Sequence, residues 1–126
     1  MLNCIVIGLG GFIGSVLRYL AGKLTLAPHT AFPLNTLLIN VLGSFAIGLI
    51  AALVARDPGL NPRLVLFARV GLCGGFTTFS TFSLETFELL RAGSYAAAGL
   101  YAVLSAVLSA VLCVLAVVLA HMLVKA

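Results

Sequence analysis

The stretch from residue 71 to residue 85, GLCGGFTTFSTFSLE, holds residue types that can handle ions inside a membrane-length apolar segment. It contains three glycines, three threonines, two serines, three phenylalanines and one glutamate. Paired glycines weaken a helix, and hydroxyl groups in hydrocarbon need hydrogen-bond partners that lipid cannot supply. A helix that only anchors a protein has no use for this composition. The stretch therefore predicts a broken membrane helix that lines a path for an ion.

The glycine pair Gly74-Gly75, with Thr77-Thr78 after it, has the composition of a cation site. A break there leaves backbone carbonyls without their helical amide partners, and in lipid a bound cation can satisfy them. If two antiparallel copies met at this point, four carbonyls would converge on one axis, enough for a small alkali ion. The alternative is a kink whose carbonyls are satisfied by threonine hydroxyls.

The second half of the same stretch has the composition of an anion site. Phe79 and Phe82 are three residues apart and share one face of a helix. The edge of a phenyl ring is electropositive, so two edges beside the donors of Asn40, Ser80 and Thr81 would make a nearly dry site for an anion. On spacing alone, core packing is the commoner explanation for such a pair.

Two other segments each carry polar side chains at positions i, i+4 and i+8, which lie on one face of a helix. These are Thr36, Asn40 and Ser44 in one segment, and Tyr101, Ser105 and Ser109 in the other. A hydroxyl in a membrane helix can bond to its own i−4 carbonyl, but the Asn40 amide cannot be satisfied that way. Asn40 therefore either links two helices or donates to an ion. The hydroxyl row on the last segment either packs at a tight interface or lines a pore.

Arg18 and Glu85 are charged side chains within apolar segments, where charge is costly and usually functional. Arg18 either extends along its stem to the membrane surface or faces a water-filled vestibule, where it would attract anions. Glu85 lies deeper, and we expect it to be hydrogen-bonded or to face the same kind of vestibule.

The composition of the chain requires lipid around it. Of the 126 residues, 63% are hydrophobic and 8% are charged, whereas a soluble domain has about 25% charged residues. The net charge of +4 comes from few charged side chains, and it does not indicate a surface that binds nucleic acid. Four segments reach the roughly 20 apolar residues that a spanning helix needs: about 2–21, 34–54, 62–90 and 95–124. The sequence thus predicts an all-α membrane protein, one domain over residues 1–126, with a retained first helix and a broken third helix.

The charges near the span ends are almost balanced between the two sides of the membrane. Both termini fall on one side, with three cations there and three on the other if Arg18 reaches its nearer end. The first set is Arg56, Arg63 and Lys125, and the second is Arg18, Lys23 and Arg91. The positive-inside rule then gives almost no orientation preference. We expect insertion in both orientations and pairing of two copies about a two-fold axis in the membrane plane.

The first segment has small residues at the spacing of a close helix contact. Gly10 and Gly14 are four apart, as are Gly11 and Ser15. A dinucleotide-binding fingerprint is excluded, because Ile13 occupies the place of its third glycine and no soluble βαβ unit surrounds it.

Three motifs resemble those of the Fluc (CrcB) family of fluoride channels: the stretch at 71–85, NTLLINVLGSF at 35–45 and GGFIGSVLR at 10–18. The length and the four-span layout are also similar, so the resemblance covers essentially the whole chain. It implies an antiparallel, dual-topology homodimer in the bacterial inner membrane, with two fluoride pores and a structural sodium ion at the dimer axis. By motif position, the backbone carbonyls of Gly74 and Thr77 from each copy would bind the sodium.

The same resemblance assigns pore residues by position. It implies an aromatic box, a pore asparagine and a hydroxyl track, with neighbouring hydroxyls in the pore and supporting residues at the vestibule. The aromatic box would be Phe79 and Phe82, the pore asparagine Asn40, and the hydroxyl track Tyr101, Ser105 and Ser109. The neighbouring pore hydroxyls would be Ser80 and Thr81, and the supporting residues at the vestibule Arg18, Thr36 and Glu85. The implied function is passive, voltage-driven export of fluoride that confers fluoride resistance, without enzyme activity.

Two other classes share the size and the span count. A small proton-coupled multidrug exporter needs an acid deep in the membrane, and the first segment has none. A purely structural membrane subunit would not need a broken helix, Asn40 and a hydroxyl row together.

Overall fold

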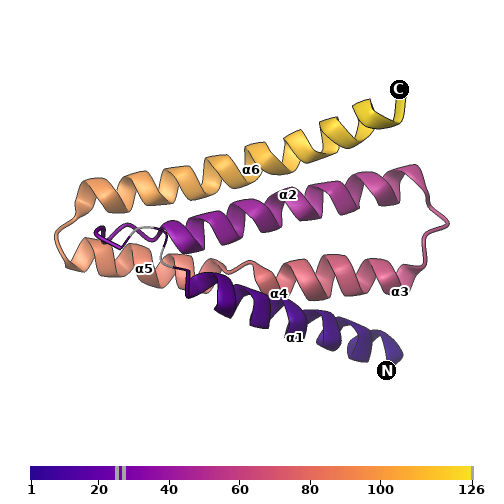
Figure 1. The fold of residues 1–126 in the computed structure, drawn as a ribbon, viewed down its shortest axis with the longest axis horizontal. Coiled ribbons are helices and arrows are strands. Elements are labelled where there is room, and N and C mark those ends of the chain that lie inside the picture. Colours follow the sequence, from indigo (N-terminus) through magenta and orange to yellow (C-terminus); the bar gives the residue numbers. More distant parts are fainter. Residues whose placement is uncertain (25, 27, 126) are drawn as a thin grey trace.

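A computed structural model describes residues 1–24, 26 and 28–125 of the chain. Figure 1 shows an elongated bundle of helices, with the N- and C-terminal ends at the same end of the bundle. Every regular element in the described part is helical. Four helical runs are long and apolar enough to cross a membrane: Leu2–Gly22, Leu34–Arg56, Pro62–Arg91 and Tyr95–Leu123. The prediction of an all-α protein with four membrane spans is therefore confirmed, with bounds close to those expected.

The spans form two pairs. The first span is α1 (Leu2–Gly22), the second is α2 (Leu34–Arg56) and the last is α6 (Tyr95–Lys125). The helix α2 packs mainly against α6, and α1 packs mainly against the third span. Figure 1 shows α6 running beside α2, with α1 beneath the third span.

The third span consists of several segments: α3 (Pro62–Val65), a π-helical run η1 (Leu66–Cys73), α4 (Gly74–Phe76) and α5 (Phe79–Arg91). Its start is capped by Asn61, whose side-chain oxygen accepts from the Arg63 amide at 2.9 Å, and Pro62 suits the first helical position. Between α4 and α5, Thr77 (φ −77°, ψ 156°) and Thr78 (φ −150°, ψ 115°) have extended dihedrals. The glycine pair, where the sequence placed the weakness, lies within α4.

The α1 helix and the third span touch backbone to backbone. A Cβ atom placed on Gly10 would lie 2.5 Å from the Phe67 carbonyl oxygen, and one placed on Gly75 would lie 2.5 Å from the Gly11 carbonyl oxygen. A Cβ atom on Gly14 would overlap the Leu72 carbonyl oxygen. The close helix contact predicted from the small-residue spacing is therefore confirmed, and its partner is the third span.

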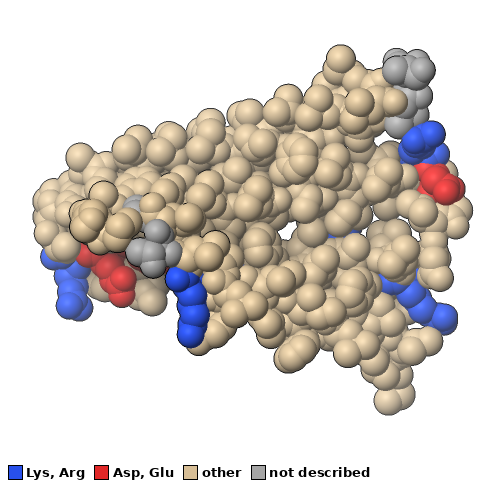
Figure 2. All heavy atoms as spheres, in the orientation of Figure 1, with Lys and Arg blue, Asp and Glu red and all other residues tan. Residues whose placement is uncertain are grey.

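Charged side chains gather toward the two ends of the bundle on the face that Figure 2 shows, with a broad uncharged band between them. That distribution fits a protein whose middle lies in hydrocarbon. The cation count near the span ends did not include Arg69, which lies in η1 and is exposed. With Arg69 the two sides carry four and three cations, so the balance is close but not equal.

The glycine contact gives a stability prediction. Replacing Gly10 by Ala should destabilise the protein by about 1–3 kcal/mol, because the backbone atoms of η1 cannot move aside without separating the helices. The measurement is the midpoint of thermal unfolding in detergent. Gly8→Ala is the matched control, since a Cβ atom there meets nothing within 4 Å. Equal midpoints for the two variants would show that α1 can shift away from η1 without cost.

Candidate functional site

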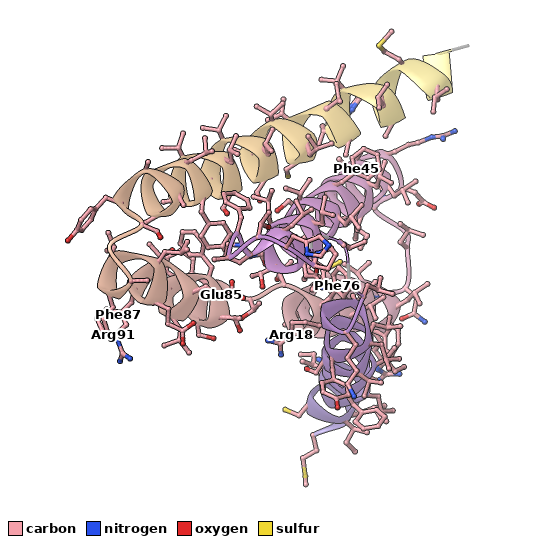
Figure 3. All side chains as sticks on the ribbon, turned by 60° about the vertical axis from the view of Figure 1, so that its left-hand side comes forward. Arg18, Phe45, Phe76, Glu85, Phe87 and Arg91 are labelled. Atoms are coloured by element: carbon pink, nitrogen blue, oxygen red, sulfur yellow. The ribbon has the colours of Figure 1, made fainter. Side chains whose placement is uncertain are left out.

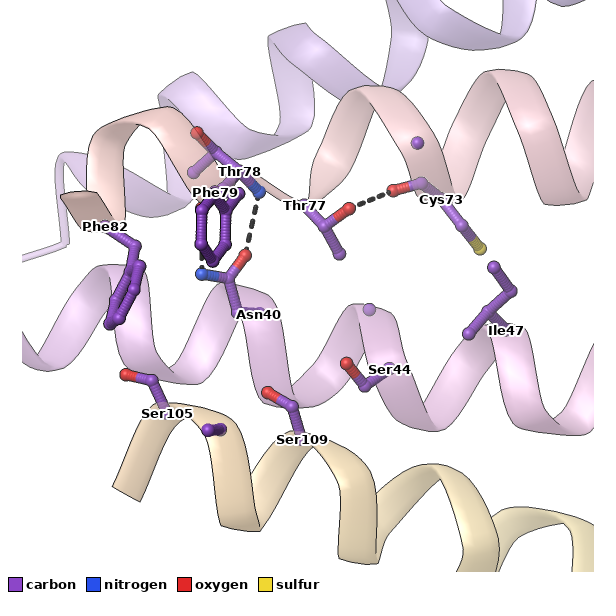
Figure 4. Close-up of a pocket in the computed structure, with 13 residues that line it drawn as sticks. Asn40, Ser44, Ile47, Cys73, Thr77, Thr78, Phe79, Phe82, Ser105 and Ser109 are labelled. Atoms are coloured by element: carbon purple, nitrogen blue, oxygen red, sulfur yellow. Dashed lines mark hydrogen bonds between the residues drawn. The ribbon is translucent and has the colours of Figure 1, made fainter. Parts of the chain in front are cut away.

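A cavity of about 390 Å³ lies between α2, the third span and α6 (Figure 4). We call it the inner cavity. Its lining contains no charged side chain. Five of the eight predicted pore residues line it: Asn40, Phe79, Phe82, Ser105 and Ser109. The remaining lining residues are Gly43, Ser44 and Ile47 of α2; Cys73, Gly74, Thr77 and Thr78 of the third span; and Ala106 of α6.

Asn40 joins α2 to the interruption of the third span. Its Oδ1 atom accepts from the Thr78 amide at 2.8 Å, and its Nδ2 atom donates to the Thr78 carbonyl oxygen at 3.0 Å. The side-chain amide thus pairs with the backbone as another peptide group would (Figure 4). Thr78 is only 7% exposed, so both of its backbone groups would be costly to leave unpaired. This pairing explains why the extended residues are the threonines and not the glycines.

The asparagine is therefore a link between helices, and it retains one donor. A side-chain amide has two N–H groups, and within the described residues only one hydrogen bond uses them. Because Asn40 also lines the inner cavity, its second N–H can serve a bound anion. The two alternatives that the sequence left open for Asn40 are compatible with each other.

The carbonyls of Gly74 and Thr77 are among those that the interruption leaves without a helical amide partner. The Thr78 amide, which would bond to the Gly74 carbonyl in a continuous helix, donates to Asn40. The Thr81 amide, which would bond to the Thr77 carbonyl, donates to the Thr78 hydroxyl at 3.1 Å. The Thr77 hydroxyl donates to the Cys73 carbonyl at 2.9 Å, so it relieves neither oxygen. These two oxygens are neutral, hard donors of the kind that suit an alkali cation.

The chain is open on the side of Gly74 where a side chain would project. A Cβ atom on Gly74 would meet nothing within 4 Å, so this face of the chain is open. The described residues contain no group of three or more His, Cys, Asp or Glu side chains placed to hold a metal.

Three aromatic rings continue from the interruption into the bundle. The Phe79 and Phe82 centroids are 5.3 Å apart with the planes at 42°, and the Phe82 and Tyr101 centroids are 5.2 Å apart at 48°. Phe79 is 79% exposed, which leaves one ring of the predicted pair uncovered in a single chain. Phe82 packs between Phe79 and Tyr101, so the two rings of the predicted pair have different surroundings.

The hydroxyl row predicted on α6 divides into two parts. Ser105 is 7% exposed, and its Oγ atom has no hydrogen-bond partner among the described residues. A buried hydroxyl without a partner is costly, by about 1–3 kcal/mol, so Ser105 can donate to whatever occupies the cavity. Tyr101 is fully buried, is absent from the cavity lining, and donates its only hydroxyl proton to Glu85.

Glu85 connects three helices through its two carboxylate oxygens. The Thr36 hydroxyl of α2 donates to Oε1 at 2.8 Å, and the Tyr101 hydroxyl of α6 donates to Oε2 at 2.6 Å. The expectation that Glu85 is hydrogen-bonded is confirmed, and the same contacts show what Thr36 and Tyr101 do in this structure.

A second cavity, of about 460 Å³, lies where α1, α2 and α5 meet. We call it the outer cavity. Figure 3 shows Arg18 on the side of α1 toward α5, from which Glu85 projects, and both side chains line this cavity. Its remaining lining residues are Ser15, Tyr19, Gly22, Lys23, Asn35, Thr36, Ile39, Thr78 and Thr81. The three predicted vestibule residues, Arg18, Thr36 and Glu85, are thus brought together.

Two predicted pore hydroxyls lie outside the inner cavity. Thr81 lines the outer cavity and accepts from the Thr78 hydroxyl at 2.9 Å. Ser80 is exposed and lies 3.4 Å from that same hydroxyl, lining neither cavity.

The residue that sequence reasoning missed is Thr78, which belongs to the linings of both cavities. It also caps α5 through its side chain. The available signal was a threonine directly before an apolar helical run, which is typical of an N-cap.

Comparison with known proteins identifies one family and several similar proteins that bear the same name. Residues 5–117 match the family described as CrcB-like protein, camphor resistance (CrcB). The chain is similar to proteins named "Fluoride-specific ion channel FluC" from three bacteria. In Chlorobium chlorochromatii the identity is 47% over 100 residues, covering 79% of this chain and 77% of the relative. In Ruminiclostridium cellulolyticum it is 45% over 106 residues, covering 83% and 82%. In Azobacteroides pseudotrichonymphae it is 42% over 101 residues, covering 79% and 81%.

The pairing of Asn40 with Thr78 gives a prediction about backbone protection. Replacing Asn40 by Ala removes both hydrogen bonds, so the Thr78 amide should exchange its hydrogen at least tenfold faster, on the order of 1–3 kcal/mol of lost protection. The measurement is hydrogen exchange of the purified protein followed by NMR. Ser44→Ala is the matched control, because Ser44 also lines the inner cavity from α2 and makes no bond to Thr78. Unchanged exchange in Asn40→Ala would mean that the pairing does not hold the interruption.

Proposed function

The chain belongs to the CrcB-like protein family, and from that membership we propose that it conducts fluoride passively out of the cytoplasm. It is a multi-pass membrane protein, and its relatives are named as ion channels, which are not enzymes. The observation that carries the proposal is the lining of the inner cavity. It combines an asparagine amide, two phenyl rings and a buried hydroxyl that has no partner within the described part of the chain, and it includes no charged side chain.

The chemistry of that cavity suits a small, strongly hydrated anion. Fluoride must exchange its water for other donors before it can enter a narrow pore, and removing that water is costly. The Asn40 amide, the hydroxyls of Ser105 and Ser109 and the ring edges of Phe79 and Phe82 can replace part of it. Because none of these groups is a cation, the ion is bound weakly enough to leave again.

The outer cavity supplies the entrance. Arg18 and Lys23 line it, and their positive charges raise the local concentration of anions. Thr78 lies in both linings, so an ion passing between the cavities moves by this residue. Fluoride entering the cell as the weak acid HF dissociates in a more neutral cytoplasm, and the membrane potential then drives the anion outward.

We further propose that the working unit is an antiparallel homodimer with dual topology and two pores, one for each inner cavity. The near balance of cations on the two sides supports insertion in both orientations. Gly74 and Phe79 are exposed at the interruption in the single chain, where a second copy would cover them. A two-fold axis beside Gly74 would bring both interruptions together.

A structural sodium ion at that axis fits the donors present. The carbonyl oxygens of Gly74 and Thr77, once from each copy, would hold it, since their helical amides are directed elsewhere. When bound, the ion would neutralise these oxygens and tie the two copies together. This assignment requires nothing of the threonine side chain, which bonds to Cys73.

The proposal is tested by fluoride efflux from liposomes that contain the purified protein and are loaded with potassium fluoride. With valinomycin present to carry potassium, fluoride should leave rapidly, while chloride should leave far more slowly. Phe79→Ile and Phe82→Ile should each lower fluoride efflux at least about tenfold, because the electropositive ring edge is lost.

Phe87→Ile is the matched control for those two variants, since Phe87 is also on α5 but lines neither cavity. Figure 3 shows it close to Arg91. The Phe87→Ile variant should conduct like the wild type, and size-exclusion chromatography should show the same oligomer for all. An absence of fluoride efflux from liposomes with the wild-type protein would refute the channel function. Proton flux driven by a cationic drug would favour a multidrug exporter. Normal efflux from both phenylalanine variants would refute the aromatic box.

The sodium assignment predicts a requirement for sodium that side-chain changes leave intact. Protein reconstituted in sodium-free buffer should lose most of its fluoride efflux and regain it when sodium is returned. Thr77→Val should keep the same requirement, because the ligands are backbone oxygens. Full efflux in rigorously sodium-free liposomes would contradict the assignment.

A further inference from the structure

Asn35 ties the carboxyl end of α1 to the first turn of α2. Its Nδ2 atom lies 3.3 Å from the Ala21 carbonyl oxygen, 3.0 Å from that of Gly22 and 2.6 Å from that of Leu24. An amide nitrogen has two N–H groups, so at least one of them is shared between carbonyls. One side chain therefore covers three acceptors at this helix end.

The carbonyl end of a helix carries a partial negative charge of about half an electron. Gly22 and Asn35 belong to the lining of the outer cavity together with Arg18 and Lys23. An anion entering there would meet the negative end of α1 beside the two cations. By donating to the carbonyls, the Asn35 amide reduces their negative potential in the cavity.

The same turn of α2 also donates a hydrogen bond to Glu85, the other negative group of the outer cavity. Thr36, the next residue, donates to Glu85 at 2.8 Å, and Tyr101 donates to the other carboxylate oxygen. The two negative features of this lining, the α1 carboxyl end and Glu85, thus both accept hydrogen bonds from the first turn of α2. Lys23 also lies at this helix end, and its ammonium is 4.6 Å from the Tyr19 ring centroid.

We propose that Asn35 is a positioning residue for anion entry, which shields the carbonyl end of α1 and holds that end, with Arg18, at the outer cavity. The inference rests on the proposed function, because it assigns a part of the fluoride path. It concerns the entrance, which the pore assignments above do not include.

The test compares fluoride efflux from liposomes containing the wild type and Asn35→Ala at several ionic strengths set with an impermeant salt. At low ionic strength the variant should be slower by about threefold or more. The deficit should shrink as salt is added, because charges are screened over about 30 Å at 0.01 M but only about 10 Å at 0.1 M. Asn35→Gln, which keeps the amide donors, should recover most of the rate.

Asn61→Ala is the matched control, since it removes an asparagine cap at the opposite end of the bundle. It should leave both the rate and its salt dependence unchanged. An Asn35→Ala deficit that is the same at all ionic strengths, or no deficit at all, would overturn the inference and leave the channel function standing. An absence of fluoride efflux from the wild type would instead refute the proposed function, and this inference with it.

Discussion

The constraint on which this structure depends is that every backbone polar group at membrane depth needs a partner. A continuous helix meets that need within itself, and the third span departs from this at Thr77 and Thr78, which are extended. There the Asn40 amide substitutes for a peptide group on both sides of Thr78. The interruption is therefore a defined conformation held by a neighbouring helix, which releases the Gly74 and Thr77 carbonyls in a fixed place.

The glycines of α1 hold the third span against a neighbouring backbone. Because Gly10 and Gly14 have no side chain, α1 contacts η1 and α4 backbone to backbone just before the interruption. One half of the third span is thereby fixed to α1, while α5 contacts α6. The inner cavity lies on the side away from α1, between α2, the third span and α6. The small residues thus act at the site indirectly, by anchoring one of its walls.

The sequence predicted the four spans closely because each is a long apolar run, and lipid makes hydropathy a strong signal. Five of the eight residues predicted for the pore line the inner cavity, and helical periodicity accounts for three of them, Asn40, Ser105 and Ser109. It could not show that the Tyr101 hydroxyl bonds to Glu85. Helical periodicity tells which face of the helix a side chain is on, but not which group it forms a hydrogen bond with. The sequence likewise misplaced the interruption, since propensity favours a break at Gly74-Gly75 while a tertiary bond from Asn40 decides it at Thr78.

The polar groups of the bundle divide by whether their donors are already engaged. Thr36, Tyr101 and Asn35 direct theirs at negative groups of the protein, the Glu85 carboxylate and the α1 carbonyls, so these oxygens do not confront an anion unshielded. Ser105 and the second N–H of Asn40, which line the inner cavity, have no hydrogen-bond partner among the residues that the structure describes. A path for an anion needs both conditions at once, because free donors attract the ion only where nearby acceptors are already satisfied. Spacing alone does not separate the two groups, since Tyr101 and Ser105 are one helical turn apart on the same face.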